Sequence, residues 1–580
     1  MTTDRTDLMV AIDQPKIYDF EYFYSEVVGA GRANEGLRTD WQAHLKLVQS
    51  ACGFKYVRFH GLYHDDMHVL SEVDGKHVYN FQYIDALFDT MLDMGVRPFV
   101  EFGFCPSLIA TQRDTVGPNL LSPSSVHCAV ESLTDRNCRF SGGKVTVALL
   151  KIWTNGPIWC GRQWIIGFNA MVCTRFALGI SNVGTRSVHW VGRLGSARVE
   201  SKLTHSKPNL SAFFKGSRSQ YYALYECTVK AVKQLNADLR VGGPATSNYV
   251  PDTRFDDEWE DMEVQKQLAN VEDIDALHWR PVWVEHFLRW CHTRQLPVDF
   301  VSCHPYPTDW ALDTSGSMSK RVRGLEATPT DLQYLRQIVS QSAYPSAEIH
   351  LTEWSSSPSS RDHAHDEIPA AIYIVRTMLA SLNLVDTLAY WTFTDVFEEE
   401  GCGMTPFHGG FGLINLQGIP KPAFHAFRLL KGLGREVLVQ NKSDSIVTRS
   451  SENGLISAIL FHYPDEVKTS PPPAYNDPRA AESLLKLGSP TTKKLILKGL
   501  RPGSPFKVEK LSPGGPGDVK SAYRRLGSPK TLSRQMIKDL RAYAMNLQVS
   551  VVNADPEGVL VLEEEMGPWS LIALSQTAAN

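Results

Sequence analysis

The second half of the chain contains the run His350-Leu351-Thr352-Glu353-Trp354-Ser355-Ser356. Its first residues mix apolar and polar side chains as a buried β-strand does, and the serine-rich segment that follows is typical of a loop. A glutamate at the carboxyl end of a strand, directly before a loop, occupies the position where a barrel of parallel strands carries its catalytic groups. An ordinary surface glutamate at a strand end would give the same pattern, so the choice depends on the rest of the chain.

Strand-like and helix-like segments alternate on both sides of this run. Besides the strand that ends at Glu353, strand-like segments lie at residues 26–31, 55–60, 97–102, 239–243, 298–304 and 388–393. Helix-like segments lie at residues 40–50, 83–94, 220–235, 283–293, 332–340 and 368–382. Such alternation implies a parallel sheet with helices outside it. With an eighth strand expected between Phe102 and Leu239, we predict an α/β fold, a (β/α)8 TIM barrel, over residues 23–432.

The pattern changes after Lys431. Short β-type runs follow, at residues 445–448, 455–461, 494–498, 546–552, 559–562 and 570–574. Turns rich in proline and glycine separate them, which is typical of an antiparallel β-sandwich. We therefore predict a β-sandwich accessory domain over residues 433–580. The N-terminal segment, residues 1–22, is a candidate for an added strand of this sandwich.

Composition excludes several classes of protein. A net charge of −4 and a pI near 6.5 give no electrostatic basis for a nucleic-acid partner or for binding to an anionic membrane surface. No apolar run approaches the length of a membrane span. The polar N-terminus lacks the apolar core of a signal peptide, and the ten Cys lack metal-ligand spacing and a disulfide framework, so we predict a cytoplasmic location. The sequence leaves open whether the chain forms a homo-oligomer.

Polar side chains gather where the predicted strands end. They are Arg58, His60, His304, Tyr306, Glu353, Trp391, Asp395, Glu398 and Glu399. Each has an ordinary explanation, because a histidine at a strand end is often structural and an acidic run is often a solvated surface. Together, however, an aromatic ring surrounded by carboxylates, histidines and an arginine suits a sugar. Sugar hydroxyls need charged hydrogen-bond partners, and the face of a pyranose ring stacks on an aromatic side chain.

Two long motifs make a family resemblance specific. The run at residues 390–399, followed by Phe407-His408-Gly409-Gly410-Phe411-Gly412-Leu413, resembles the β-xylosidases of glycoside hydrolase family 39. The segments at residues 58–66, 242–245 and 351–353 resemble the same family. The resemblance extends from about Val27 to Val439, with one large gap. The related α-L-iduronidases share the chemistry, and the glycine-rich run at 408–412 resembles the xylosidase branch.

The resemblance implies a retaining glycosidase that removes terminal β-1,4-linked xylose from xylo-oligosaccharides. Glu353 would be the nucleophile, and Arg58 would lie beside it and keep it ionised. The residues implied to bind the substrate are Arg58, His60, Phe213, His304, Tyr306, Trp391, Glu398 and Glu399. Two carboxyl groups and water suffice for this chemistry, so neither a metal nor an organic cofactor is implied.

The chain departs from the family at the second carboxyl group. A retaining glycosidase needs an acid/base about 5–5.5 Å from the nucleophile, which the family supplies from a Trp-Asn-Glu-Pro-Asn motif after the fourth strand. Here Ser206 and Lys207 precede Pro208. Lys207 thus occupies the acid/base position, and its ammonium is a poor acid near neutral pH that would pair with Glu353. The nearest upstream carboxylate is Glu200, which lies about 23 Å from the position of Lys207 if the residues between them are extended.

The surrounding segment is also unusual. Residues 136–199 contain no Asp or Glu, although 63 of the 580 residues are acidic. A gap of this length arises by chance roughly once in a thousand. Residues 136–207 are either a specialised basic segment or translated non-coding or frame-shifted sequence. Three hypotheses therefore remain open: an impaired β-xylosidase-like enzyme, an α-L-iduronidase-like hydrolase, and a sugar-binding protein without catalysis.

Overall fold

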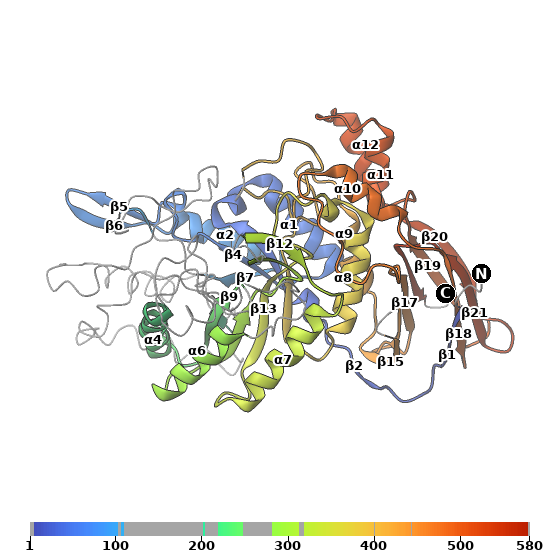
Figure 1. Cartoon of the computed structure of the whole chain (residues 1–580), viewed down its shortest axis with the longest axis horizontal. Helices are drawn as coiled ribbons and strands as arrows, with labels where there is room; N and C mark the ends of the chain where they lie inside the picture. Colours follow the sequence, from blue (N-terminus) through green and yellow to red (C-terminus); the bar gives the residue numbers. More distant parts are fainter. Residues whose placement is uncertain are drawn as a thin grey trace.

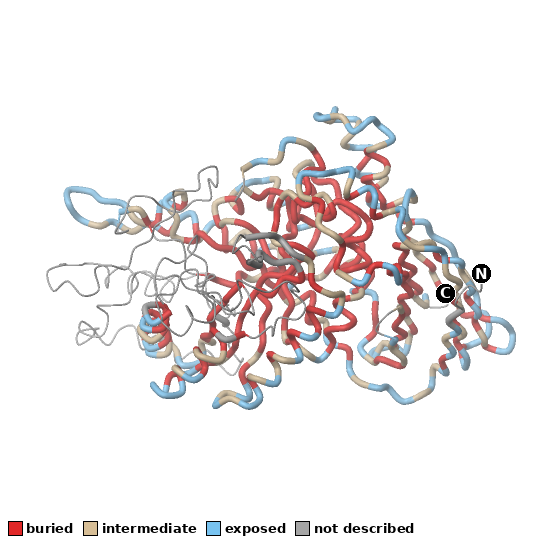
Figure 2. The backbone as a smooth tube through the Cα atoms, in the orientation of Figure 1, coloured by how far each residue is buried: buried red, intermediate tan, exposed pale blue. Residues whose placement is uncertain are grey.

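The computed structural model describes residues 5–101, 106–108, 201–203, 218–247, 281–312, 318–398, 401–441 and 444–577. Figure 1 shows a sheet surrounded by helices and, beside it, a β-rich part that contains both ends of the chain. Burial is concentrated in the centre of the first part, whereas the hairpin of β5 (Leu70–Val73) and β6 (Lys76–Tyr79) and the helix α12 (Arg534–Met545) are largely exposed (Figure 2).

Eight parallel strands form the central sheet, in the order β7-β4-β3-β14-β13-β10-β9-β8. Their bounds are β3 Val27–Arg32, β4 Tyr56–His60, β7 Arg97–Val100, β8 Ser201–Leu203, β9 Leu239–Thr246, β10 Phe300–Cys303, β13 Glu348–Trp354 and β14 Thr387–Tyr390. The two edge strands, β7 and β8, lie close to each other, so the sheet curves toward closure. The predicted parallel, TIM-like barrel is confirmed in this form, and β8 falls in the interval where the eighth strand is expected.

Helices lie on the outside of this sheet. They are α1 Thr39–Cys52, α2 Gln82–Asp93, α4 Arg218–Leu235, α6 Val282–Thr293, α7 Ala327–Gln341, α8 Ile368–Ala380 and α9 Pro422–Leu430. In α8 every residue except Arg376 is buried. This helix is apolar on all sides, which suits its packing both against the barrel and against strand β17 (Ile456–His462) of the β-rich part.

Two sheets make up the β-rich part. The larger has the order β2-β15-β16-β17-β22-β19-β20 and the smaller β1-β18-β21. The bounds are β1 Arg5–Ala11, β2 Tyr18–Asp19, β15 Glu436–Asn441, β16 Ser445–Arg449, β17 Ile456–His462, β18 Thr491–Lys498, β19 Pro505–Leu511, β20 Gln548–Asn553, β21 Val559–Met566 and β22 Ser570–Gln576. All pairs are antiparallel except β1 with β18. Both sheets contribute to one hydrophobic cluster.

The β-rich part also contains helices that the sequence pattern does not predict: α10 Pro478–Ser483, α11 Val519–Arg525 and α12 Arg534–Met545. The structure also contains two hairpins, β5 Leu70–Val73 with β6 Lys76–Tyr79 and β11 Thr308–Leu312 with β12 Met318–Val322. The N-terminal segment supplies β1 and β2 to the two sheets. The domain boundary at residue 433 stays a prediction.

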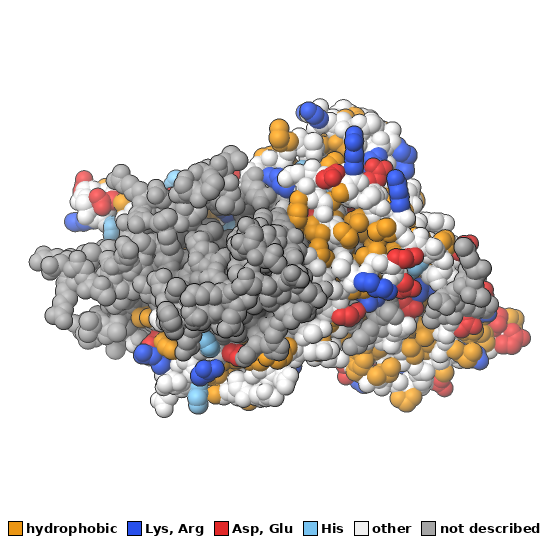
Figure 3. Space-filling view, viewed as in Figure 1, with side chains coloured by type: hydrophobic (Ala, Val, Ile, Leu, Met, Phe, Trp, Pro, Cys, Tyr) orange, Lys and Arg blue, Asp and Glu red, His pale blue; other side chains and the backbone are white. Residues whose placement is uncertain are grey.

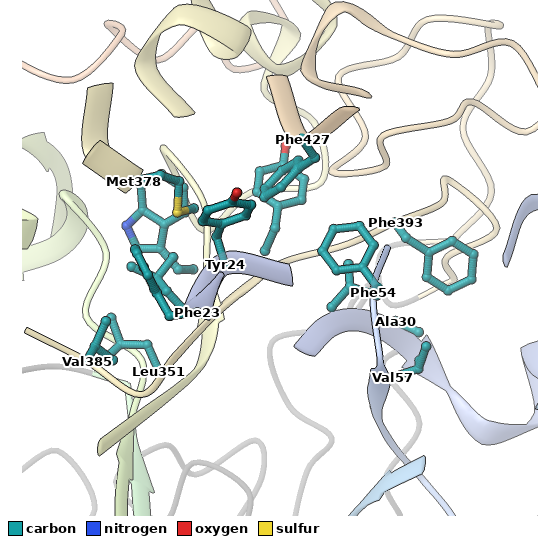
Figure 4. Packing of buried hydrophobic residues seen from close by; sticks show 14 of the residues in the cluster. Phe23, Tyr24, Ala30, Phe54, Val57, Leu351, Met378, Val385, Phe393 and Phe427 are labelled. Atoms are coloured by element: carbon teal, nitrogen blue, oxygen red, sulfur yellow. The ribbon is translucent and has the colours of Figure 1, made fainter. Parts of the chain in front are cut away.

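One hydrophobic core extends across both parts of the chain. Tyr24, which lies just before β3, contacts Phe427 of α9, and Phe54 contacts the same ring (Figure 4). The same cluster includes Trp569 and Leu571 of the β-rich part. On the surface, basic and acidic side chains are interspersed over the face of the β-rich part drawn in Figure 3. Among the described helices, none has the length and apolar composition to cross a bilayer.

Candidate active site

Glu353 lies at the carboxyl end of β13, and its side chain is fully buried. Arg58 is on β4, which β3 and β14 separate from β13 in the sheet, and it donates a hydrogen bond from Nη1 to Glu353 Oε1. The Tyr306 hydroxyl donates to Oε2 at 3.3 Å, and His304 Nδ1 lies 3.9 Å from the same oxygen. Three strands, β4, β10 and β13, thus bring the predicted polar residues together because their carboxyl ends meet at one end of the barrel.

Glu101 joins this group, and the sequence analysis does not select it. It directly follows β7, is fully buried, and accepts a hydrogen bond from Arg58 Nη2. A carboxylate at the end of a predicted strand is the same signal that points to Glu353. The rule that finds Arg58 and His60 therefore also applies to Glu101.

Arg58 is held as a cation between two carboxylates. Burial alone lowers the pKa of its guanidinium, but the charges of Glu101 and Glu353 more than offset burial, so the pKa is raised above its ordinary value. The guanidinium also lies over the ring of Trp391, with Cζ 5.3 Å from the ring centroid. His60 packs near the same ring at a centroid distance of 5.6 Å.

Trp391 begins an aromatic wall beside the polar group. Its ring contacts Phe397 edge-on at 5.9 Å, and Phe397 contacts Phe411 at 5.4 Å. All three are buried. Gly29 on β3 makes room for this wall, because a Cβ atom at this position would collide with the Trp391 ring.

Glu398 directly follows Phe397 of the aromatic wall in the sequence, and its carboxylate pairs with two arginines. Arg38 Nη1 lies 2.9 Å and Arg32 Nη2 lies 3.4 Å from the carboxylate oxygens, and the side chain is 40 % exposed. The Glu398 amide donates to Glu35 Oε1 at 2.9 Å, and the Arg32 amide donates to Glu35 Oε2 at 2.9 Å. Glu35, which the sequence analysis also misses, therefore joins the turn after β3 to the loop after β14. Burial raises the pKa of Glu35 to about 8.

The structure thus groups Arg58, His60, His304, Tyr306 and Trp391 around Glu353 or its partners. Lys207, Phe213 and Glu399 lie outside the described residues.

The model of the glycosyl hydrolases family 39 matches residues 9–119 and 181–546. The chain belongs to glycosyl hydrolases family 39. A β-xylosidase from Caldicellulosiruptor saccharolyticus is 30 % identical over 531 residues, which cover 89 % of this chain and 87 % of that protein. A β-xylosidase from Geobacillus stearothermophilus is 33 % identical over 452 residues, 75 % of this chain and 73 % of that protein. The crystal structure of the family 39 enzyme from Xanthomonas axonopodis pv. citri has a TM-score of 0.74 at 25 % identity and covers 100 % of this chain and 98 % of that one.

The resemblance predicted from the motifs is confirmed. As a member of family 39, the chain is a glycosidase, an enzyme class that hydrolyses O-glycosyl bonds and acts on carbohydrates. The two matched ranges leave out residues 120–180, which include much of the segment without acidic residues.

Asp395 follows β14, and its carboxylate is held by a backbone amide and a buried lysine. Its carboxylate accepts a hydrogen bond from the Gly412 amide at 2.6 Å and pairs with the buried Lys421 at 2.8 Å. Lys421 pairs equally with Asp366. Burial by itself raises the pKa of Asp366, but Lys421 and Lys520 lower it below the ordinary value. This cluster fixes the glycine-rich turn that carries Phe411.

Proposed function

We propose that the chain is a retaining, β-xylosidase-like glycosidase that releases terminal β-linked xylose from xylo-oligosaccharides. The observation that carries the proposal is the buried Glu353, held by Arg58 and Tyr306 at the end of β13. Two relatives that are β-xylosidases support the choice of sugar.

In the proposed first step, a Glu353 carboxylate oxygen attacks C1 of the xylose, and the bond between C1 and the leaving oxygen breaks. In the second step, water attacks C1 and the bond to Glu353 breaks, which restores the carboxylate, while the proton that the water loses passes through solvent to the leaving-group oxygen released in the first step. Arg58 keeps Glu353 ionised for the first step. We assign the binding of the sugar to His60, Phe213, His304, Tyr306, Trp391, Glu398 and Glu399, together with Arg58.

The weak step of this cycle is protonation of the leaving group. The acid/base position is occupied by Lys207, whose ammonium is a poor acid near neutral pH. Substrates whose leaving group departs without a proton should therefore react much faster than natural xylo-oligosaccharides.

A comparison of two substrates tests this function. With dinitrophenyl β-xyloside we expect rapid release of the phenolate and a xylosyl adduct on Glu353, detected by intact-protein and peptide mass spectrometry. With xylobiose, turnover should be slower by about a hundredfold or more, the usual contribution of general acid catalysis. Glu353→Gln, which keeps the shape and loses the nucleophile, should form no adduct with either substrate. Equal rates on both substrates would show that an efficient acid is present and would contradict the role given to Lys207.

The second candidate is a sugar-binding protein without catalysis, which the lysine at the acid/base position favours. It predicts saturable binding of xylobiose in calorimetry and no adduct from the activated xyloside. An adduct on Glu353 excludes this candidate.

A further inference from the structure

The guanidinium of Arg58 divides its two terminal nitrogens between two carboxylates. Nη1 donates to Glu353 and Nη2 donates to Glu101. All three side chains are fully buried. An arginine and one carboxylate usually pair through two parallel hydrogen bonds. Here Glu101 takes the nitrogen that would otherwise complete such a pair with Glu353.

The charges of this triad do not cancel. One cation stands between two carboxylates, so the group of Arg58, Glu101 and Glu353 carries one excess negative charge when all are ionised. Arg58 Nε and Glu101 Oε1 are buried and have no hydrogen-bond partner within the described part of the chain. Within the described residues, the orientation of Arg58 is therefore set by the two carboxylates and the face of the Trp391 ring.

We propose that Glu101 is a positioning residue for the nucleophile: it holds Arg58 so that Glu353 receives one of its terminal nitrogens instead of two. The inference rests on the proposed function of Glu353 and adds the residue that sets its reactivity.

The physical reason is differential stabilisation. When a Glu353 oxygen forms its bond to C1, the carboxylate loses negative charge. A cation that pairs completely with Glu353 stabilises the ionised ground state more than the transition state, and the reaction becomes slower. Glu101 limits this effect because it competes for Arg58. Its own negative charge also favours the positive charge that develops on the sugar ring in the transition state. Glu101 exchanges no proton and forms no bond with the substrate.

Three variants separate charge from structure. Glu101→Gln removes the charge and keeps the size, and Glu101→Asp keeps the charge on a shorter side chain. The matched control is Asp331→Asn, which removes the partner of another buried arginine, Arg323, with hydrogen bonds of 2.5 and 2.9 Å outside the group around Glu353. Thermal unfolding of each variant measures its loss of stability. A loss in Glu101→Gln that matches the loss in Asp331→Asn is the part that any buried ion pair would show.

The first readout uses 2-deoxy-2-fluoro-β-xylosyl fluoride, in which a Glu353 oxygen bonds to C1 and fluoride leaves without a proton. The rate constant for adduct formation is measured against pH by mass spectrometry. We expect Glu101→Gln to lower its plateau about tenfold or more and to move its acid limb about one pH unit lower. The limb moves because, without the neighbouring charge, protonation of Glu353 becomes less favourable. Glu101→Asp should keep the limb, and Asp331→Asn should keep both limb and plateau.

The assignment of the limb depends on the other groups that can titrate there. In the described residues, the elements packed around Glu353 carry Arg58, His60, Glu101, His304 and Tyr306. None of these except Glu101 differs between the parent and the Glu101→Gln protein, so a change in the limb reports the charge of Glu101.

The second readout is the crystal structure of Glu101→Gln beside that of the parent chain. We expect Arg58 to turn and place both terminal nitrogens on Glu353. An unchanged Arg58, or an acid limb that stays in place while the adduct forms, would overturn the inference. If the parent chain forms no adduct at all, the proposed function fails. The position of Arg58 then decides the role of Glu101 alone.

Discussion

Arg58 contacts both buried carboxylates of the site and the face of the Trp391 ring, so its loss should affect stability strongly. Its removal by Arg58→Met leaves Glu101 and Glu353 buried without their cation. Loss of one partner from a buried ion pair typically costs about 3–5 kcal/mol, because the remaining charge stays desolvated. We therefore expect a loss of this size in the free energy of unfolding, measured with urea at neutral pH.

The loss should shrink in acid, since protonation removes the uncompensated charges of the two carboxylates. The control is Arg449→Met. It removes a partly exposed arginine whose Nε lies 2.6 Å from Oε2 of Glu436, which is also partly exposed. Its effect should be smaller and should depend less on pH. A loss in Arg58→Met that is the same at all pH values would contradict the account.

Most residues of the site can be predicted from the sequence because strand ends are recognisable. Arg58, His304 and Glu353 each close an apolar run, and the structure brings them together. Glu101 closes a run in the same way, but the family motifs do not single it out. Glu35 cannot be found by this rule, because its importance comes from two backbone amides that are remote in sequence from each other.

Glu35 makes the junction between the turn after β3 and the loop after β14 sensitive to pH. Burial raises the pKa of its carboxyl group from 4.5 to about 8 in the folded protein. A raised pKa means that the folded state favours the protonated form. The stability that Glu35 contributes is therefore complete below about pH 4.5 and is lost as the pH rises toward 8.

Glu35→Gln removes this titration. Between pH 4.5 and 8, we expect the free energy of unfolding of the variant to rise relative to that of the parent, by on the order of 1 kcal/mol per pH unit. Urea titrations across this range measure the difference. As a control, Glu452→Gln makes the same substitution at an exposed glutamate. A flat difference for Glu35→Gln would show that Glu35 is ionised normally.

The elements themselves follow the sequence pattern closely where periodicity is strong. The helix expected at residues 368–382 is α8, Ile368–Ala380, and the strand expected at 55–60 is β4, Tyr56–His60. The helices α11 and α12 are missed because they interrupt a β-rich pattern. In the structure, the Asp518 and Ser533 side chains cap these two helices, accepting hydrogen bonds from the amides of Ser521 and Met536 at 3.2 Å.

The α11–α12 hairpin connects the β-rich part to the wall of the active site. Tyr523 packs against Phe407 at a centroid distance of 4.9 Å, and Lys520 Nζ donates to the Phe407 carbonyl at 3.4 Å. Phe407 begins the glycine-rich turn that carries Phe411, and the Phe411 ring contacts Phe397, which in turn contacts Trp391. The β-rich part is therefore in direct contact with the barrel, and it supports the aromatic wall.

Tyr523→Ala tests whether the α11–α12 hairpin supports the turn that carries Phe411. It removes a buried ring and should lower the free energy of unfolding by about 3 kcal/mol. It should also slow adduct formation from dinitrophenyl β-xyloside, because the turn that carries Phe411 loses its support. Leu526→Ala, in the same hairpin but 48 % exposed, should change stability by no more than about 0.5 kcal/mol and leave the rate unchanged. If Tyr523→Ala lowers stability but reacts at the parent rate at a temperature where it is fully folded, the hairpin stabilises the fold without shaping the site.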